Sequence, residues 1–214
     1  MKDIESVTAG ELRVDENWWR IYEDSFPASE REPAEVILES VLRGVGMAFR
    51  LRREGMTFGI ATTHLLRDPA AVFLVYLAVA HGERGRGAGR ELFEAAWESG
   101  AARLRSEGLP PLGLIWEVDP PDPAAADAGA RRSRIAFFQR NGGQLLGRPY
   151  RQPPVNGVTA VPMSLMFRPV EGEGTPSPKE IEALVRAIYF EKYEAINKID
   201  TSILDNLLRG GEKH

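Results

Sequence analysis

The sequence has 214 residues, of which 43% are hydrophobic and 27% charged, and this is the composition of a soluble globular protein with one sizeable core. Its 27 basic and 31 acidic residues give a net charge of -4, which leaves no basic excess for binding nucleic acid. Because it contains no cysteine, disulfides and thiolate nucleophiles are excluded. The polar first residues and short apolar runs favour neither export nor membrane insertion, so we expect a cytoplasmic protein.

The first half of the chain predicts two helices and a β-hairpin. In chain order the elements are a helix from Asn17 that stops by Pro27, a helix from Ser29 or Pro33, and strands over Gly46–Arg53 and Met56–Leu66. Amphipathic spacing supports the helices, and a glycine at position 55 suits the turn between the strands. Trp18 and Trp19 are adjacent and cannot share a helix face, so we expect one in the core and the other lining a groove.

The second half alternates strands and helices. Its elements are a strand over Val72–Ala80, a helix over Gly87–Ser106, a strand over Leu112–Val118, a helix over Arg131–Asn141 and a strand over Val158–Phe167. The first of these strands is an unbroken apolar run, as expected of a central strand that is covered on both faces. This order predicts an α/β layered domain.

The tail predicts a separate helical segment. Pro169–Pro178 has the composition of a linker, so we expect a main domain over residues 1–168 and a linker with a helical extension over 169–214. Ser177-Pro178-Lys179-Glu180 is a capping box, and Asp200 can cap a further helix. An apolar stripe follows the capping box at Ile181, Leu184, Val185, Ile188 and Tyr189. Such a stripe must be buried, and we expect a homodimer contact, with docking on the same chain or over the cleft as alternatives.

The most informative segment is the turn between the central strand and the long helix, Arg84-Gly85-Arg86-Gly87-Ala88-Gly89-Arg90. Three glycines let the backbone fold closely around a ligand, and the first helical amides then point at one place. With the positive end of the helix dipole and three arginines, such a turn suits a pyrophosphate. A Walker A loop fails, since Ala88-Gly89 stands where that motif needs Lys-Ser/Thr. A dinucleotide fingerprint and a kinase glycine loop fail as well, since Arg90 replaces their last glycine.

The residues from Leu77 to Phe93, LAVAHGERGRGAGRELF, resemble the acyl-CoA-binding motif of the GNAT superfamily of N-acetyltransferases. Ser25–Pro33 resembles the linker between that family's first two helices, and Ala136–Gly143 resembles its "A-x-F-Y-x-x-x-G-F" helix end. The resemblance runs in order over about residues 5–168. It implies a mixed central sheet, flanked by helices and splayed at the acyl-CoA site.

The same resemblance implies how acetyl-CoA, as co-substrate, is bound. The strand at Leu77–Ala80 splays from Leu112–Val118, the pantetheine arm pairs with backbone amides of Leu77 and Val79, and the glycine turn wraps the pyrophosphate. The amide of Val79 polarises the thioester carbonyl. The residues expected to bind the co-substrate are Leu77, Val79, Arg84, Gly85, Arg86, Gly87, Ala88, Gly89, Arg90 and Phe138.

Two side chains are expected to carry the chemistry. Glu117 ends a strand between Trp116 and Val118, where burial can raise its pKa and make it a general base. A surface or arginine-paired carboxylate is the alternative interpretation of Glu117, and Asp119, Glu30 and His81 are the other candidates for an acid or base. The family's usual acid is a tyrosine where this chain has Phe138, so Tyr150 is the nearest substitute, unless it is simply packed with its hydroxyl bonded.

We therefore expect an N-acetyltransferase that moves an acetyl group from acetyl-CoA to a primary amine of a small molecule or peptide. A degenerate GNAT fold that senses acyl-CoA without turnover is the first alternative, and a nucleotide-binding regulatory module is the second. His64, His81 and His214 show no metal-ligand spacing, so no metal is expected. Neither nucleic acid nor membrane is expected as a partner.

Overall fold

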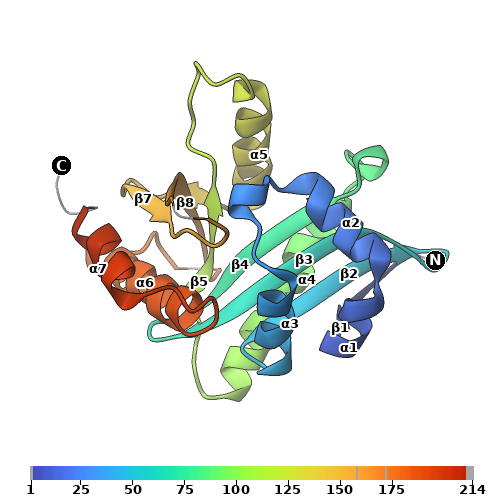
Figure 1. Ribbon diagram of the computed structural model, residues 1–214, viewed down its shortest axis with the longest axis horizontal. Coiled ribbons are helices and arrows are strands. Elements are labelled where there is room, and N and C mark those ends of the chain that lie inside the picture. The colour runs from blue at the N-terminus through green and yellow to red at the C-terminus, as the bar shows by residue number, and fades with distance from the viewer. Residues whose placement is uncertain (1, 158, 172, 211–214) are drawn as a thin grey trace.

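The computed structural model describes residues 2–157, 159–171 and 173–210 and is built around an open β-sheet (Figure 1). Its strands are β1 (Lys2–Val7), β2 (Gly46–Arg53), β3 (Met56–Arg67), β4 (Ala70–Val79), β5 (Gly113–Val118), β6 (Gln144–Leu145), β7 (Tyr150–Gln152) and β8 (Val161–Pro169). In the described part of the chain they form an eight-stranded sheet in the order β1-β2-β3-β4-β5-β8-β6, with β7 beside β8. The pair β4–β5 is parallel and the other pairs are antiparallel, so the expected mixed α/β sheet is confirmed.

Helices cover both faces of this sheet (Figure 1). They are α1 (Ala9–Val14), α2 (Glu16–Ser25), α3 (Ala34–Leu42), α4 (Ala88–Ser106), α5 (Ala128–Arg140), α6 (Pro178–Ala187) and α7 (Thr201–Gly210), with short 3-10 segments η1 (Ala28–Glu30) and η2 (His81–Glu83) and a π-helix η3 (Ile188–Glu194). Strand alternation assigns the faces, since Ala48 packs with α1–α3 and the next residue, Phe49, packs with α4.

The expected helices and strands are present, with shifts of a few residues at their ends. Glu54 and Gly55 both have positive φ, 51° and 82°, as a tight hairpin between β2 and β3 requires. Strands β1 and β7 and helix α1 were not expected, although a capping box at Thr8 and Glu11 marks the start of α1. Val158, expected to begin the last strand, lies outside the described residues.

A β-bulge separates the end of β4 from β5. Leu74 and Tyr76 face the consecutive residues Thr63 and Thr62 of β3, so Val75 is the extra residue of the bulge. Bulges bend a strand and increase its twist. The pairing of β4 with β5 covers Val72–Leu74 and then ends at the bulge, which leaves the second half of β4 diverging from β5.

The C-terminal helices pack on the chain's own sheet. The apolar stripe of α6 shares a core with Phe73 of β4 and Ile115 of β5, and Leu184 and Ile188 are fully buried. The capping box at Ser177 and Glu180 forms as expected, and Asp200 accepts a hydrogen bond from the Ser202 amide at the start of α7. The expectation of a dimer contact through this stripe is therefore corrected to docking on the same chain, because the stripe is already covered.

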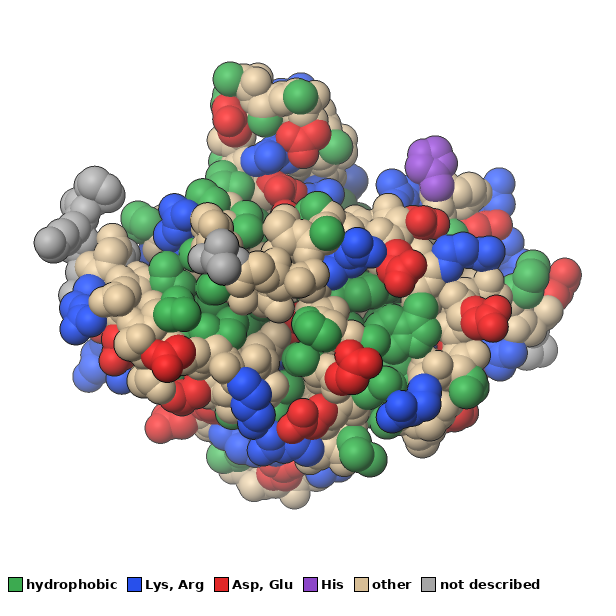
Figure 2. All heavy atoms as spheres, viewed as in Figure 1, with side chains coloured by type: hydrophobic (Ala, Val, Ile, Leu, Met, Phe, Trp, Pro, Cys, Tyr) green, Lys and Arg blue, Asp and Glu red, His purple; other side chains and the backbone are tan. Residues whose placement is uncertain are grey.

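The surface carries charges of both signs. Figure 2 shows acidic and basic side chains interspersed over the face that carries α1–α3. Within the described ranges, no helix combines the length and the apolar character needed to cross a bilayer.

Candidate active site

The diverging end of β4 presents backbone groups toward β5. The Ala80 amide donates to the Phe58 carbonyl at 2.8 Å, on the β3 side of the strand. Because successive residues of a strand direct their backbone groups to opposite sides, the amides of Leu77 and Val79 face the gap beside β5. The Val79 carbonyl, on that same side, accepts a 3.0 Å hydrogen bond from Nε of Arg84.

The glycine turn follows directly and ends in helix α4. Gly85 and Gly87 have φ of 78° and 84°, which only glycine adopts without strain. Gly87 is the N-cap of α4 and, as a glycine, has no side chain of its own to cap the first helical amides. Since α4 is 19 residues long, its first amides and its dipole make a strong anion site at this end. That this turn binds a pyrophosphate stays a prediction.

The two adjacent phenylalanines of α5 have different surroundings. Phe138 is buried in the core, with its ring 4.8 Å from the ring of Trp116 and 5.5 Å from that of Phe93. Phe137 is half-buried and lies over the glycine turn, where a Cβ on Gly89 would meet its ring at 3.4 Å. Phe137 was not selected from the sequence; its side chain lies at the turn, whereas that of Phe138 fills the core.

Glu117 projects from the end of β5 toward the C-terminal helices. On this strand Leu114, Trp116 and Val118 pack on the α4 side, so the alternating Ile115 and Glu117 face the other way. The Glu117 carboxylate accepts a 2.5 Å hydrogen bond from Tyr150 at Oε1 and bonds of 2.9 and 3.0 Å from Tyr193 at Oε1 and Oε2.

Burial raises the pKa of Glu117 to about 7, although the two phenol hydrogen bonds act in the opposite direction. Burial also holds the pKa values of Tyr150 and Tyr193 well above 10, with the Glu117 charge adding to the effect. At neutral pH the site therefore holds two protonated phenols and a carboxyl group that is poised to take up or release a proton.

The other expected acid–base candidates have different surroundings. Asp119 is paired with Arg134 and lies 3.9 Å from Arg131, so its charge is compensated. Burial and the neighbouring Asp119 charge raise the pKa of Glu30. His81 is exposed in η2, beside the glycine turn.

The adjacent tryptophans of α2 also have separate surroundings. Trp18 is fully buried and donates to the Phe49 carbonyl, whereas Trp19 is half-buried and donates to the Leu12 carbonyl. The expected core tryptophan is thus Trp18, and the hydrogen bond of Trp19 directs it to helix α1.

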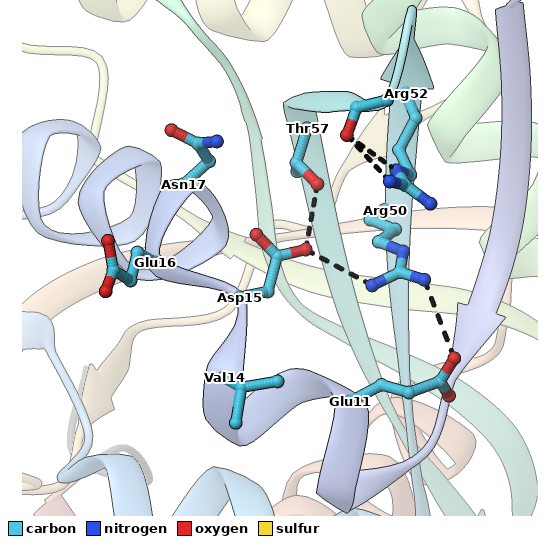
Figure 3. A pocket seen from close by; sticks show the side chains of 9 residues that line it. Glu11, Val14, Asp15, Glu16, Asn17, Arg50, Arg52 and Thr57 are labelled. Carbon is cyan, nitrogen blue, oxygen red and sulfur yellow. Dashed lines mark hydrogen bonds and ion pairs between the residues drawn. The ribbon is translucent and has the colours of Figure 1, made fainter.

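Two hollows of the described structure lie away from the gap between β4 and β5, and neither is lined by Glu117. The first, of about 380 Å³, lies where α1 meets α2, and there Arg50 bridges Glu11 and Asp15 while Thr57 bonds Asp15 (Figure 3). The second, of about 590 Å³, extends from Arg90 along α4 to the end of α5. The ion pairs of the first hollow satisfy their charges internally, which indicates a structural role.

Over residues 2–157, 159–171 and 173–210, no group of three or more His, Asp or Glu side chains is arranged to hold a metal ion. His64 is buried in β3, which lowers its pKa well below the usual value, and His214 lies outside these ranges.

Comparisons with known proteins show which fold this chain shares. No protein-family model matches the sequence, and no curated protein matches it. Among solved structures, a protein described as a GNAT-family acetyltransferase from Bacteroides thetaiotaomicron is 21% identical, with a TM-score of 0.66 over 88% of this chain and 96% of that one. NAA60 of Arabidopsis thaliana, solved with acetyl-CoA, is 16% identical, with a TM-score of 0.57 over 80% of this chain and 100% of that one.

A ribosomal-protein-alanine N-acetyltransferase from Brucella melitensis is similar as well, at 20% identity and a TM-score of 0.55 over 78% of this chain and 99% of that one. At these identities the similarity concerns the fold. It covers between 96% and 100% of each compared chain. The chain therefore has the fold of the GNAT superfamily, and the resemblance drawn from its glycine turn is confirmed at that level.

Proposed function

We propose that this protein is an N-acetyltransferase that moves an acetyl group from acetyl-CoA directly to a primary amine of a small molecule or peptide. The observation that carries the proposal is the gap between β4 and β5. It has the glycine turn at one end and Glu117, with a pKa of about 7, at the end of the facing strand. An acyl carrier with a pyrophosphate and an amine that must lose a proton both fit this arrangement.

The chain offers suitable groups to acetyl-CoA. The amides at the start of α4 and the arginines of the turn would hold the pyrophosphate, and the gap-facing amides of Leu77 and Val79 would hold the pantetheine arm. Phe137 would flank the turn in place of Phe138. Bound acetyl-CoA supplies the acetyl group and a thiol leaving group. The Val79 amide would stabilise negative charge on the reacting carbonyl oxygen.

Glu117 and Tyr150 would move the protons. An alkylammonium acceptor must become a neutral amine before it attacks, and Glu117 would accept its proton directly or through water. Tyr150, whose pKa is raised well above 10, stays protonated and would return a proton to the departing sulfur. A thiol of pKa about 8.5 is also a tolerable leaving group without an acid, so water can share this task with Tyr150. We propose a cytoplasmic location for this reaction.

The test is thiol release from acetyl-CoA in the presence of a panel of amines that includes small primary amines, polyamines and peptides with free N-termini. The wild-type protein is compared with Glu117→Gln, and intact mass of the products identifies the acetylated acceptor. We expect acceptor-dependent thiol release that the variant strongly reduces. Binding of acetyl-CoA without turnover on any amine would instead identify a sensor, and binding of a nucleotide in its place would identify a regulatory module.

A further inference from the structure

The C-terminal helices deliver a side chain to the candidate base. Tyr193 lies in the π-helix η3 and is fully buried, and its hydroxyl donates to both oxygens of Glu117, at 2.9 and 3.0 Å. A hydroxyl has one proton, so it is shared between two acceptors and fixes the plane of the carboxylate. Residues 76 positions apart are thus in contact at the end of β5.

A buried ion pair fixes the position of Tyr193. The adjacent Lys192 donates to Glu32 at 2.6 Å and to Asn197 at 2.9 Å, and Asn197 donates to the same oxygen of Glu32 at 2.7 Å. The Lys192 and Glu32 side chains are each 2% exposed. Glu32 lies in the loop between α2 and α3, so this closed set of bonds ties η3 to that loop.

The local backbone of η3 is unusual. The Ala195 amide bonds the Phe190 carbonyl and the Asn197 amide bonds the Lys192 carbonyl, which are i to i+5 bonds. A π-helix of this kind widens the turn and is found at functional sites more often than elsewhere. Here it accompanies two consecutive side chains, Lys192 and Tyr193, that are both buried and have different partners.

Among the described residues, the titratable groups that face Glu117 include Tyr150 from β7, Tyr193 and Tyr189 from η3, and Glu30 and Glu32 from the loop between α2 and α3. The charges of Glu30 and Glu32 disfavour an ionised Glu117, and Lys192 compensates Glu32. The hydroxyls of Tyr150 and Tyr193 favour the ionised form, because both donate to the carboxylate. Tyr189 donates to the Arg151 carbonyl instead, at 2.7 Å.

We infer that Tyr193 is a positioning residue of the acetyltransferase site, contributed by the C-terminal helices, which orients the Glu117 carboxylate and keeps it available as a proton acceptor. The inference rests on the proposed function for the role of Glu117, whereas the hydrogen bonds that carry it are independent of that function. It makes the segment after residue 177 a part of the site that the main domain lacks on its own.

The experiment compares Tyr193→Phe with Tyr189→Phe in the full-length chain. Each variant keeps the aromatic ring and removes one hydroxyl of η3. Of these two hydroxyls, only that of Tyr193 donates to Glu117. The two readouts are the acidic limb of kcat/KM for acetyl transfer and the titration of the Glu117 carboxyl carbon by ¹³C NMR. The Glu117 signal is assigned by its loss in Glu117→Gln.

For Tyr193→Phe we expect both the acidic limb and the Glu117 carboxyl pKa to rise by about one pH unit, because a hydrogen bond to the charged form is lost. Turnover at pH 7 should fall about fivefold and recover near pH 9, in line with the shifted pKa. Tyr189→Phe should change neither the midpoint of the acidic limb of kcat/KM nor the midpoint of the Glu117 titration. An unchanged Glu117 titration in folded Tyr193→Phe overturns the inference. If the wild-type chain transfers no acetyl group, the proposed function fails, and the NMR titration still decides whether Tyr193 controls Glu117.

Discussion

The Tyr150 hydroxyl donates a 2.5 Å hydrogen bond to Oε1 of Glu117, which joins the candidate acid and the candidate base in one contact. Because the phenol donates, the bond favours the ionised carboxylate, while the burial of Glu117 opposes ionisation and leaves its pKa at about 7. When Glu117 takes a proton from the substrate amine, that proton therefore lies beside the Tyr150 hydroxyl, which is able to donate a proton of its own. This coupling would let the two groups exchange a proton during one turnover.

Glu117→Gln should lower the rate of acetyl transfer by about 10²–10⁴-fold at neutral pH, with little change in acetyl-CoA affinity, because a general base is lost and the glycine turn is untouched. In the wild type the rate should rise with pH through about 7, as Glu117 loses its proton. The rate of the Glu117→Gln variant should not show this rise near pH 7. It should increase only at high pH, where free amine is plentiful. Full activity of the variant at pH 7, measured by thiol release, would show that Glu117 is not the base.

Tyr150→Phe should cost less than Glu117→Gln, roughly tenfold or below, because water can protonate a thiolate of ordinary pKa. The same variant removes one hydrogen bond from the Glu117 carboxylate, so the acidic limb of its pH profile should also move upward. Steady-state rates from pH 6 to 9 separate the two effects. A loss as large as that of Glu117→Gln at every pH would mean that water cannot replace the phenol.

Lys192→Met should destabilise the protein by about 3–5 kcal/mol, because it leaves the buried charge of Glu32 without its partner. Denaturant unfolding of the wild type and the variant measures this difference. The double variant Lys192→Met with Glu32→Gln is the control, since it removes both charges and should recover much of the lost stability. Equal unfolding midpoints for the wild type and the single variant would exclude a structural role for this ion pair.

Gly100 lies where α4 approaches β4 closely, and a Cβ at this position would meet the Val72 methyls at 2.8 and 2.9 Å. Gly100→Ala should therefore destabilise the fold by roughly 1–3 kcal/mol, although alanine favours a helix. Gly129→Ala in α5 is the matched control, because its Cβ meets no atom of the described residues within 4 Å. It should be neutral or slightly stabilising. Thermal unfolding of both variants measures the difference in their stabilities. The two variants would be equally stable if α4 could shift away from Val72.

The sequence predicts the parts of the fold that have local signals. The unbroken apolar run of β4, the helical spacing of α4 and the glycine turn between them all lie where they were expected. Glu117 was selected because it ends a strand between two apolar residues, and that alternation is what turns it away from the α4 core. Strand β1 was missed because it is a short, mostly polar edge strand, which has only one neighbour to satisfy.

The contacts of the C-terminal helices could not be predicted in the same way. An amphipathic stripe indicates that one helix face is covered, but it does not indicate which part of the protein, or which other subunit, covers it. The sheet of the same chain covers this stripe, and Tyr193 reaches Glu117 across 76 residues of sequence. The different surroundings of Phe137 and Phe138 could not be predicted either, because the rotation of α5 depends on the contacts of Phe138 with Trp116 and Phe93.

The most direct measurement is calorimetric titration of acetyl-CoA into the wild type and into Gly87→Asp. Gly87 is the N-cap of α4, where an aspartate would place a carboxylate against the amides that are proposed to hold the pyrophosphate. Because the φ of 84° strains any side chain at this position, the comparison uses only variant protein that is shown to be folded. Gly82→Asp is the charge-matched control, because Gly82 has open space around its Cβ position in the described structure and lies in η2, before the turn. We expect binding to the wild type and to Gly82→Asp, and an affinity at least about tenfold weaker for folded Gly87→Asp, since one unfavourable charge contact of this kind is worth a kilocalorie or more. Equal affinity of folded Gly87→Asp and the wild type would contradict the assignment of the glycine turn as the acyl-CoA site.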